Sequence, residues 1–149
     1  MMWVLDWLKK RNTAPPPAED DLTILAVSVF LNDRLVLEQI GKREGWKLRF
    51  TNSARDAFRL VMENHFDVVL CDRNQYGYPW REVVERLAEN SPRSRILLVS
   101  PANDDYLWRD VVQQGGYDVL TRPLREQDAL YAIAAAAGFL SSPESSQSR

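Results

Sequence analysis

Short apolar runs alternate with amphipathic stretches along most of the chain. The first run, "LTILAVSV", is followed by "DRLVLEQIGKREG", in which Leu35, Val36 and Ile40 recur at helical spacing and Gly45 can end a helix. The pattern predicts five strand–helix units. The predicted strands are "LTILAVSV", "WKLRF", "DVVLC", "RILLVS" and "YDVLT". The predicted helices span residues 33–45, 53–64, 79–90, 104–114 and 125–140.

The composition of these segments indicates how they pack. The runs "DVVLC" and "ILLVS" are continuously apolar, as in strands of a parallel sheet that helices cover on both faces. Ser53, with Asp56 three residues later, is typical of a helix start. The last helix is rich in alanine, which permits close packing on a sheet. We therefore predict a three-layer α/β/α doubly wound domain with a five-stranded parallel sheet, of the flavodoxin-like kind.

The two ends of the chain differ from this domain. Residues 1–21 combine a short amphipathic helix, with Trp3, Val4, Trp7 and Leu8 on one side, and the proline-rich linker "NTAPPPAEDD". So short a helix must dock on something, and its own domain or a second copy is favoured over a partner or a membrane surface. We place the domain at residues 22–140 and a disordered, serine-rich tail at residues 141–149.

Charge and cysteine content exclude several classes of function. A net charge of −2, with cations scattered among acids, argues against a nucleic-acid partner. The single cysteine, Cys71, excludes an internal disulfide and lies in an apolar run, so we expect a small buried hydrophobe. No apolar run reaches the ~20 residues that span a bilayer, and the N-terminus lacks the charge order of a signal peptide. These features favour a soluble cytoplasmic protein without a membrane span.

Polar residues stand at the carboxyl ends of several predicted strands, where doubly wound folds gather their active groups. Asp72 ends the third apolar run, Ser100 ends the fourth, and Arg122 follows the fifth. A carboxylate, a hydroxyl and a guanidinium should therefore converge on one rim of the sheet. Pairing with Arg122 would keep Asp72 ionised. The alternative is an ion pair that only closes the top of the sheet.

Three segments carry a resemblance to a known family. The segments "FDVVLCDRNQYGYPW", "RILLVSPAND" and "GGYDVLTRPL" resemble the later signature segments of receiver domains of two-component response regulators. The resemblance extends over residues 22–140. It implies that Asp72 occupies the position that accepts a phosphoryl group from a histidine kinase. It also implies that Ser100 and Arg122 occupy the positions that contact the phosphoryl oxygens, and that Pro123 matches the proline that follows.

The chain departs from the family where the family binds Mg²⁺. Two adjacent acids end the first strand in the family, and Ser28 and Val29 stand there in this sequence. Asp33 is expected to cap the first helix instead. Because phosphoryl transfer depends on a cation that offsets the charge of the transferring oxygens, Mg²⁺-assisted phosphorylation should be lost or weakened. Arg122 could then form a bidentate pair with Asp72 and hold it permanently.

Aromatic residues cluster near the same rim. Tyr76, Tyr78 and Trp80 follow Asp72, and Trp108 lies on the helix predicted at residues 104–114. They could fill the space of the lost metal site or form an exposed protein-binding surface. In the family, the position of Val119 holds a Tyr or Phe that moves inward on phosphorylation. We include Val119 among the residues of the possible protein-binding surface.

The favoured hypothesis is a degenerate, stand-alone receiver-like domain that acts as a protein-interaction module. We expect no enzymatic activity, no cofactor and no metal. The expected partner is a histidine kinase or a downstream signalling protein, and a homodimer through the helix 104–114 and the strand 117–121 is plausible. A working phosphoacceptor at Asp72 is the first alternative. A small-ligand-binding doubly wound domain ranks last, because the chain lacks a glycine-rich phosphate loop.

Overall fold

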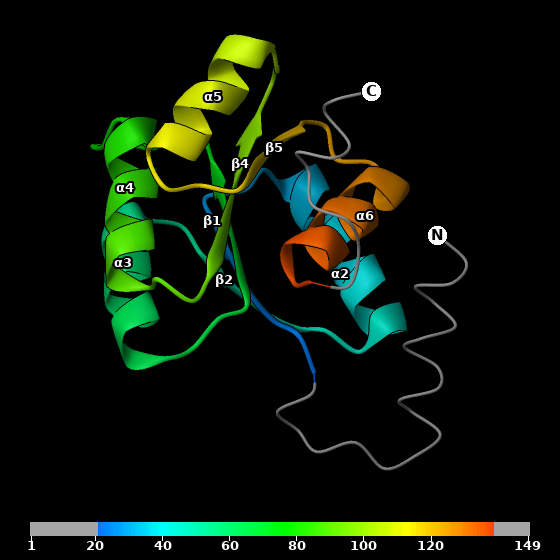
Figure 1. The fold of residues 1–149 in the computed structure, drawn as a ribbon. Helices are drawn as coiled ribbons and strands as arrows, with labels where there is room; N and C mark the ends of the chain where they lie inside the picture. The colour runs from blue at the N-terminus through cyan, green and yellow to red at the C-terminus, as the bar shows by residue number, and fades with distance from the viewer. Residues whose placement is uncertain (1–20, 139–149) are drawn as a thin grey trace.

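Five parallel strands form one central sheet with the spatial order β2-β1-β3-β4-β5 (Figure 1). The strands are β1 (Thr23–Val27), β2 (Lys47–Thr51), β3 (Val68–Asp72), β4 (Arg95–Ser100) and β5 (Asp118–Thr121). This computed structural model describes residues 21–138. The predicted N-terminal helix, the proline-rich linker up to residue 20 and the serine-rich tail lie outside the described residues.

Helices cover both faces of the sheet. They are α2 (Leu31–Glu44), α3 (Ala54–Glu63), α4 (Trp80–Asn90), α5 (Asp105–Gln113) and α6 (Glu126–Ala136). Helices α3, α4 and α5 lie on one face, and α2 and α6 lie on the other (Figure 1). The predicted three-layer doubly wound fold with a five-stranded parallel sheet is confirmed.

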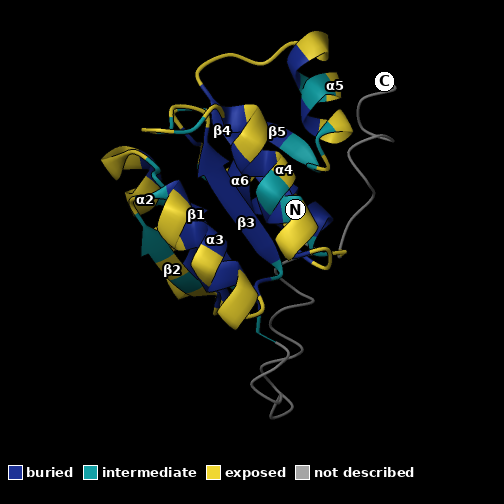
Figure 2. Ribbon diagram, turned by 90° about the vertical axis from the view of Figure 1, so that its left-hand side faces the viewer, coloured by how far each residue is buried: buried dark blue, intermediate teal, exposed yellow. Residues whose placement is uncertain are grey.

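The two central strands explain why the apolar runs are continuous. Every residue of β3 is buried, and so is every residue of β4 after Arg95 (Figure 2). Side chains that alternate along β3 point into two separate cores. Val69 and Cys71 pack with α3, α4 and α5, while Val68 and Leu70 pack with α2 and α6.

Cys71 is fully buried and has no disulfide partner. Burial, and after it the negative charge of the neighbouring Asp72, raise the pKa of the Cys71 thiol to about 12. The prediction of a small buried hydrophobe is confirmed. The thiol remains protonated near neutral pH and is not a nucleophile in the folded chain.

Local sequence signals place most helix ends. The Ser53 side chain accepts a hydrogen bond from the Asp56 amide at 3.0 Å, which confirms the predicted start of α3. Gly45 ends α2 with a φ of 78°, a backbone conformation that glycine adopts without strain. Helix α6 ends at Ala136, earlier than predicted, and Gly138 follows with a φ of 92°.

The expected role of Asp33 as a helix cap is wrong. Helix α2 begins two residues earlier than predicted, its N-cap is Phe30, and no side chain accepts a capping hydrogen bond there. Asp33 is the third residue of the helix, and its carboxylate faces the loop that follows β5 instead.

No helix among residues 21–138 combines the length and apolar character that crossing a membrane requires.

Candidate functional site

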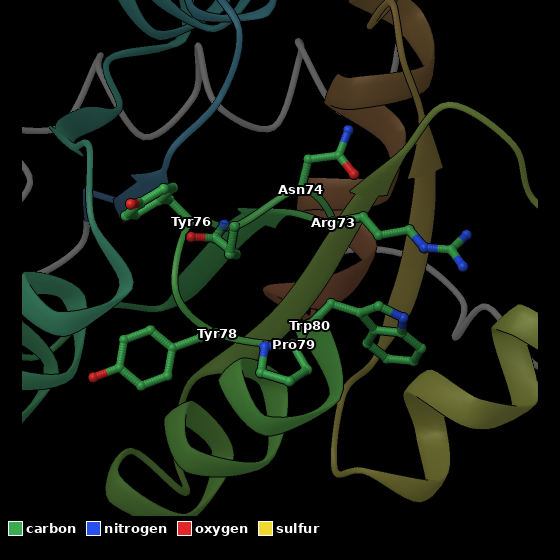
Figure 3. Close-up of a pocket in the computed structure, with 7 residues that line it drawn as sticks. Arg73, Asn74, Tyr76, Tyr78, Pro79 and Trp80 are labelled. Atoms are coloured by element: carbon green, nitrogen blue, oxygen red, sulfur yellow. The ribbon is translucent and has the colours of Figure 1, made fainter.

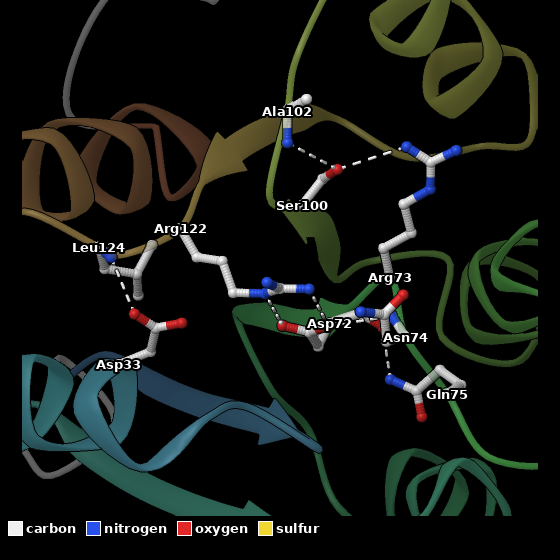
Figure 4. A network of polar contacts seen from close by, with 9 residues as sticks. All are labelled: Asp33, Asp72, Arg73, Asn74, Gln75, Ser100, Ala102, Arg122 and Leu124. Atoms are coloured by element: carbon white, nitrogen blue, oxygen red, sulfur yellow. Dashed lines mark hydrogen bonds and ion pairs between the residues drawn. The ribbon is translucent and has the colours of Figure 1, made fainter.

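The carboxyl ends of β3, β4 and β5 bring Asp72, Ser100 and Arg122 to one rim of the sheet (Figure 4). Asp72 is the last residue of β3 and Ser100 the last residue of β4, and Arg122 follows β5 directly. The Arg122 amide donates to the Ser100 carbonyl at 2.9 Å, which fixes the start of the loop after β5. The predicted convergence of the three side chains is confirmed.

Arg122 engages both carboxylate oxygens of Asp72. Its Nε lies 2.9 Å from Oδ2 and its Nη2 lies 3.3 Å from Oδ1. The Asp72 side chain is 0% exposed and the Arg122 side chain 12% exposed, so water hardly screens the pair. The guanidinium also lies 4.1 Å from the centre of the Phe30 ring. Two hydrogen bonds to Asp72 and the contact with the Phe30 ring therefore hold Arg122 over Asp72.

The loop after β3 is built around Asp72. The Asn74 amide donates to Asp72 Oδ1 at 2.9 Å, and Gln75 Nε2 donates to the Asp72 carbonyl at 2.6 Å. A carboxylate that accepts a backbone amide two residues on is typical of a tight turn. With Arg122, these contacts give both carboxylate oxygens a donor without any metal ion.

Ser100 is in contact with a residue that the sequence did not single out. The Ser100 hydroxyl accepts hydrogen bonds from Arg73 Nη1 and from the Ala102 amide, both at 3.4 Å. Arg73 follows Asp72 directly, so its position beside the rim could have been inferred from the end of the strand. The direction of its side chain, toward β4, could not.

The residues at the end of β1 do not face Asp72 as acids would in the family. The Ser28 hydroxyl donates to the Asn52 carbonyl at 2.9 Å, in the loop between β2 and α3. Ser28 adopts a φ of 57°, which is uncommon for a residue other than glycine. Val29 packs, half-buried, against the core beneath α2 and α6.

Asp33 is a second carboxylate near Arg122 that sequence reasoning placed elsewhere. It is 1% exposed, and its Oδ1 accepts the Leu124 amide at 2.8 Å. Its Oδ2 is buried and has no hydrogen-bond partner among the described residues. Asp33 and Arg122 line the same small cavity of about 150 Å³, together with Phe30, Asn32 and Pro123. By holding Leu124, Asp33 positions the loop that carries Arg122.

The aromatic residues after Asp72 do not form one exposed surface (Figure 3). Tyr76 is fully exposed, but Trp80 is 7% exposed and belongs to the core beneath α3, α4 and α5. Tyr78 is half-buried and meets the Phe58 ring edge-on at 5.4 Å. Of the five residues proposed for an interaction surface, Trp80 and Val119 are buried and Tyr78 and Trp108 are partly buried. Trp80 and Tyr78 therefore pack mainly against the core beneath α3, α4 and α5.

The residues at the rim do not fit a Mg²⁺ ion of the kind that the family binds. Mg²⁺ prefers an octahedral set of oxygens with one or two carboxylates. Both oxygens of Asp72 are engaged by Arg122, Ser28 gives its hydroxyl to Asn52, and Val29 has no ligand atom. Among residues 21–138 no group of three or more His, Cys, Asp or Glu side chains could hold a metal.

The fold is that of a receiver domain. The family described as response regulator receiver domain matches residues 31–134, so the chain belongs to that family. It is a receiver domain of the type found in two-component response regulators, and the resemblance stated from the sequence is confirmed.

Individual relatives are distant. The transcriptional regulatory protein ZraR of Escherichia coli K12 is 24% identical over 105 residues, which are 70% of this chain and 24% of ZraR. The chain thus spans about a quarter of the length of the curated relatives it matches.

Solved structures show the same fold at low identity. A response regulator from Thermotoga maritima is 19% identical, with a TM-score of 0.71 over 78% of this chain and 98% of that one. The BeF3-activated DrrB receiver domain is 18% identical, with a TM-score of 0.67 over 78% and 97%. A Burkholderia pseudomallei response regulator with a phosphorylated aspartic acid, a calcium ion and citrate is 17% identical, with a TM-score of 0.65 over 87% and 76%.

Proposed function

We propose that this chain is an atypical receiver domain that acts as a protein-interaction module in cytoplasmic two-component signalling. In this proposal, metal-assisted phosphorylation of Asp72 is lost or strongly weakened. The observation that carries it is the buried pair between Asp72 and Arg122, in which Arg122 Nε lies 2.9 Å from Oδ2 and Nη2 lies 3.3 Å from Oδ1.

This pair opposes phosphorylation in two ways. A phosphodonor must approach an oxygen of Asp72, and one oxygen is covered by Nε and the other by Nη2 of Arg122. Moving Arg122 away would leave a carboxylate that is 0% exposed without its partner, and breaking a buried ion pair in this way costs roughly 3–5 kcal/mol. Arginine also binds a carboxylate as a planar fork, which the single ammonium of a lysine cannot do.

The lost acids support the proposal independently. Without carboxylates at positions 28 and 29, nothing at the end of β1 helps Asp72 to hold a divalent cation. Two anions would then have to approach each other with only arginine side chains to offset their charge. Signalling would depend on which proteins the folded domain binds. The proposed partner is a histidine kinase or a downstream signalling protein.

A second candidate, a working phosphoacceptor, is favoured by one observation. Asp72, Ser100 and the cation Arg122 lie together at the rim, as the family arranges its acceptor, hydroxyl and cation. A histidine kinase could displace Arg122 from Asp72 on binding. Transfer would then proceed by a route that does not require the missing acids.

Mass spectrometry after incubation with acetyl phosphate separates the two candidates. The full chain, with and without Mg²⁺, would be analysed for a phosphoryl adduct at Asp72. We expect no adduct above the background of Asp72→Asn. Clear labelling that is lost in Asp72→Asn, whether or not it requires Mg²⁺, would contradict the weakened receiver and support the phosphoacceptor.

A further inference from the structure

The start of α2 carries an exposed apolar patch. Leu31 is 70% exposed, Leu35 is 51% exposed, and Phe30, the residue before the helix, is 49% exposed. Leu31 and Leu35 are four residues apart, so they lie on the same side of the helix. These three residues, called the α2 patch below, are three of the eight exposed large apolar residues within residues 21–138.

Most of the other exposed apolar side chains do not gather in this way. Met62 is on α3, which covers the opposite face of the sheet from α2 (Figure 1), and Tyr76 is in the loop after β3. Tyr106 and Val112 are six residues apart on α5, which places them on different sides of that helix. Single exposed apolar residues are common, whereas neighbouring ones mark interaction sites. The α2 patch is therefore a candidate interaction surface.

A cation beside the patch indicates what kind of side chain would cover it. The Arg34 guanidinium lies 4.3 Å from the centre of the Phe50 ring on β2. Its Nε also pairs with Glu38 at 3.4 Å, which occupies an edge of the planar group and not a face. The Arg34 side chain is 46% exposed, so a second ring can stack on it. Tryptophan is the ring that attracts a guanidinium most strongly.

The chain itself contains a segment of suitable composition. Residues 1–11 lie outside the described residues, and their sequence predicts a short amphipathic helix with an apolar side formed by Trp3, Val4, Trp7 and Leu8. So many large apolar residues on so short a helix need to be covered from water. The two tryptophans are four residues apart, as are Leu31 and Leu35, so the side chains of two packed helices can interdigitate.

The linker is long enough to bring this segment to the patch. Residues 12–21, "NTAPPPAEDD", precede β1 and extend over about 30 Å in the conformation that prolines favour. The patch follows the carboxyl end of β1, a strand of five residues that extends over about 16 Å. The linker is thus about twice as long as the strand it must pass. Tethering also gives the segment an effective concentration of about millimolar at its own domain, which favours it over a second copy.

We propose that residues 1–11 dock on the α2 patch of their own chain, with their tryptophans against the two leucines and Arg34. The docked segment lies beside Phe30, whose ring is 4.1 Å from the Arg122 guanidinium. It therefore restricts the outward movement of Arg122 from Asp72 and closes the start of α2 to partner proteins until it is released. This contact goes beyond the proposed function, because it does not depend on whether Asp72 is phosphorylated.

Paramagnetic relaxation in the full chain tests the contact. Asn12→Cys introduces a cysteine directly after the segment, and a nitroxide is attached to it. Cys71 is buried and its thiol stays protonated near neutral pH, so only the new cysteine reacts. We expect the amide signals of Leu31 and Leu35 in the ¹⁵N-labelled chain to be lost, and the signal of Met62 to be retained.

Leu31→Gln should restore the Leu35 signal, because it removes apolar surface from the α2 patch. Met62→Gln is the matched control, because Met62 is 71% exposed, as Leu31 nearly is, but lies on α3. It should leave the broadening unchanged. Both variants alter exposed side chains and should fold. Trp7→Gln should release the segment while the domain itself is unaltered. Equal broadening in Leu31→Gln and Met62→Gln would overturn the α2 patch as the docking site.

A mixed sample distinguishes the other possible occupants. Spin-labelled chain at natural ¹⁵N abundance, mixed with ¹⁵N-labelled chain that carries no nitroxide, reports only contacts between molecules. We expect no broadening there. Broadening in the mixed sample would mean that a second copy occupies the patch and would overturn the intramolecular contact.

Absence of broadening in both samples would overturn docking on this domain altogether, and a partner protein or a membrane would then have to cover the segment. None of these outcomes concerns the labelling of Asp72 by acetyl phosphate. The docking of residues 1–11 and the proposed function can therefore fail separately.

Discussion

Arg122 bonds both carboxylate oxygens of Asp72 across 50 positions of sequence, and Asp72 is 0% exposed. The pair ties the end of β3, at the centre of the sheet, to the loop after its edge strand β5. The two charged side chains differ in their access to water. Arg122 is 12% exposed and can reach water, whereas Asp72 cannot.

Removal of Arg122 should therefore destabilise the domain more than removal of Asp72. Arg122→Ala leaves a buried charge unpaired, and we expect the free energy of unfolding to fall by about 3 kcal/mol. Arg122→Lys keeps the charge but loses the fork, and should cost roughly 1 kcal/mol. Urea unfolding followed by tryptophan fluorescence measures both.

The control for this series is Arg93→Ala, which should change stability by less than about 0.5 kcal/mol because it alters an exposed residue. In the Asp72→Asn background, Arg122→Ala should cost less than in the wild type, because no buried charge is left alone. Equal costs in the two backgrounds would show that the pair has no energetic coupling.

Asp33 should stabilise the domain through the hydrogen bond that its Oδ1 accepts, and not through its charge. Its Oδ1 accepts the Leu124 amide, while its Oδ2 has no partner among the described residues. Asp33→Asn can keep the acceptor and removes a buried charge, so we expect equal or greater stability. Asp33→Ala leaves the Leu124 amide without its acceptor and should cost about 1–3 kcal/mol.

Thermal unfolding of the two Asp33 variants measures this difference. The Asn variant should unfold at or above the wild-type temperature, and the Ala variant below it. If Asp33→Asn destabilises as much as Asp33→Ala, the charge of Asp33 and not its hydrogen bond is what the loop requires.

Aspartates introduced at the end of β1 should make phosphorylation of Asp72 possible in the presence of Mg²⁺. We expect the variant that combines Ser28→Asp, Val29→Asp and Arg122→Lys to bind Mg²⁺ and to become labelled by acetyl phosphate. Aspartate is among the residues that tolerate the φ of 57° at position 28, although the hydrogen bond from Ser28 to the Asn52 carbonyl is lost. Calorimetry for Mg²⁺ and mass spectrometry for the adduct measure the two effects.

Arg122→Lys alone is the control for this rescue, since it frees Asp72 from the fork without adding metal ligands. It should bind no Mg²⁺. A triple variant that folds but neither binds Mg²⁺ nor becomes labelled would mean that the missing acids are not the reason for the expected weak phosphorylation.

Stability should fall at alkaline pH because of Cys71. Its pKa is raised to about 12 in the folded chain, so the unfolded chain, with an ordinary thiol pKa, loses this proton first. Below the ordinary value of 9.0 the thiol contributes no pH dependence. Between that pH and about 12 the free energy of unfolding should decrease with a slope of up to roughly 1.4 kcal/mol per pH unit.

Cys71→Ala lacks this thiol, while all other groups that ionise at high pH remain. The difference in stability between wild type and Cys71→Ala should therefore narrow as the pH rises from 8 to 11 (about the range over which a free thiol ionises). Urea titrations at fixed pH values measure it. Parallel curves would exclude the thiol as the cause.

The sequence predicted the fold well because its signals are local and agree with one another. Continuous apolar runs marked the buried strands, and Ser53 and Gly45 marked helix ends that the structure reproduces. The rule that parallel strands carry active groups at their carboxyl ends then placed Asp72, Ser100 and Arg122 on one rim.

What the sequence could not predict were the directions of side chains in the loops. Asp33 was expected to cap α2, but the helix begins earlier and the carboxylate turns toward Leu124, which is 91 positions away. Trp80 was predicted near the start of a helix, but the sequence left open whether it is buried or exposed, and the structure buries it as the first residue of α4. Both outcomes depend on tertiary contacts that no local pattern encodes.

The edge strand β2 limits how two copies of this domain can meet. Lys47 and Arg49 are exposed on β2, so a second copy that offered the same edge would bring like charges together. Such charges discourage continuation of the sheet from one molecule into the next and, with it, edge-to-edge aggregation. If the chain forms a homodimer, we expect its helices to make the interface and the sheet to end at β2.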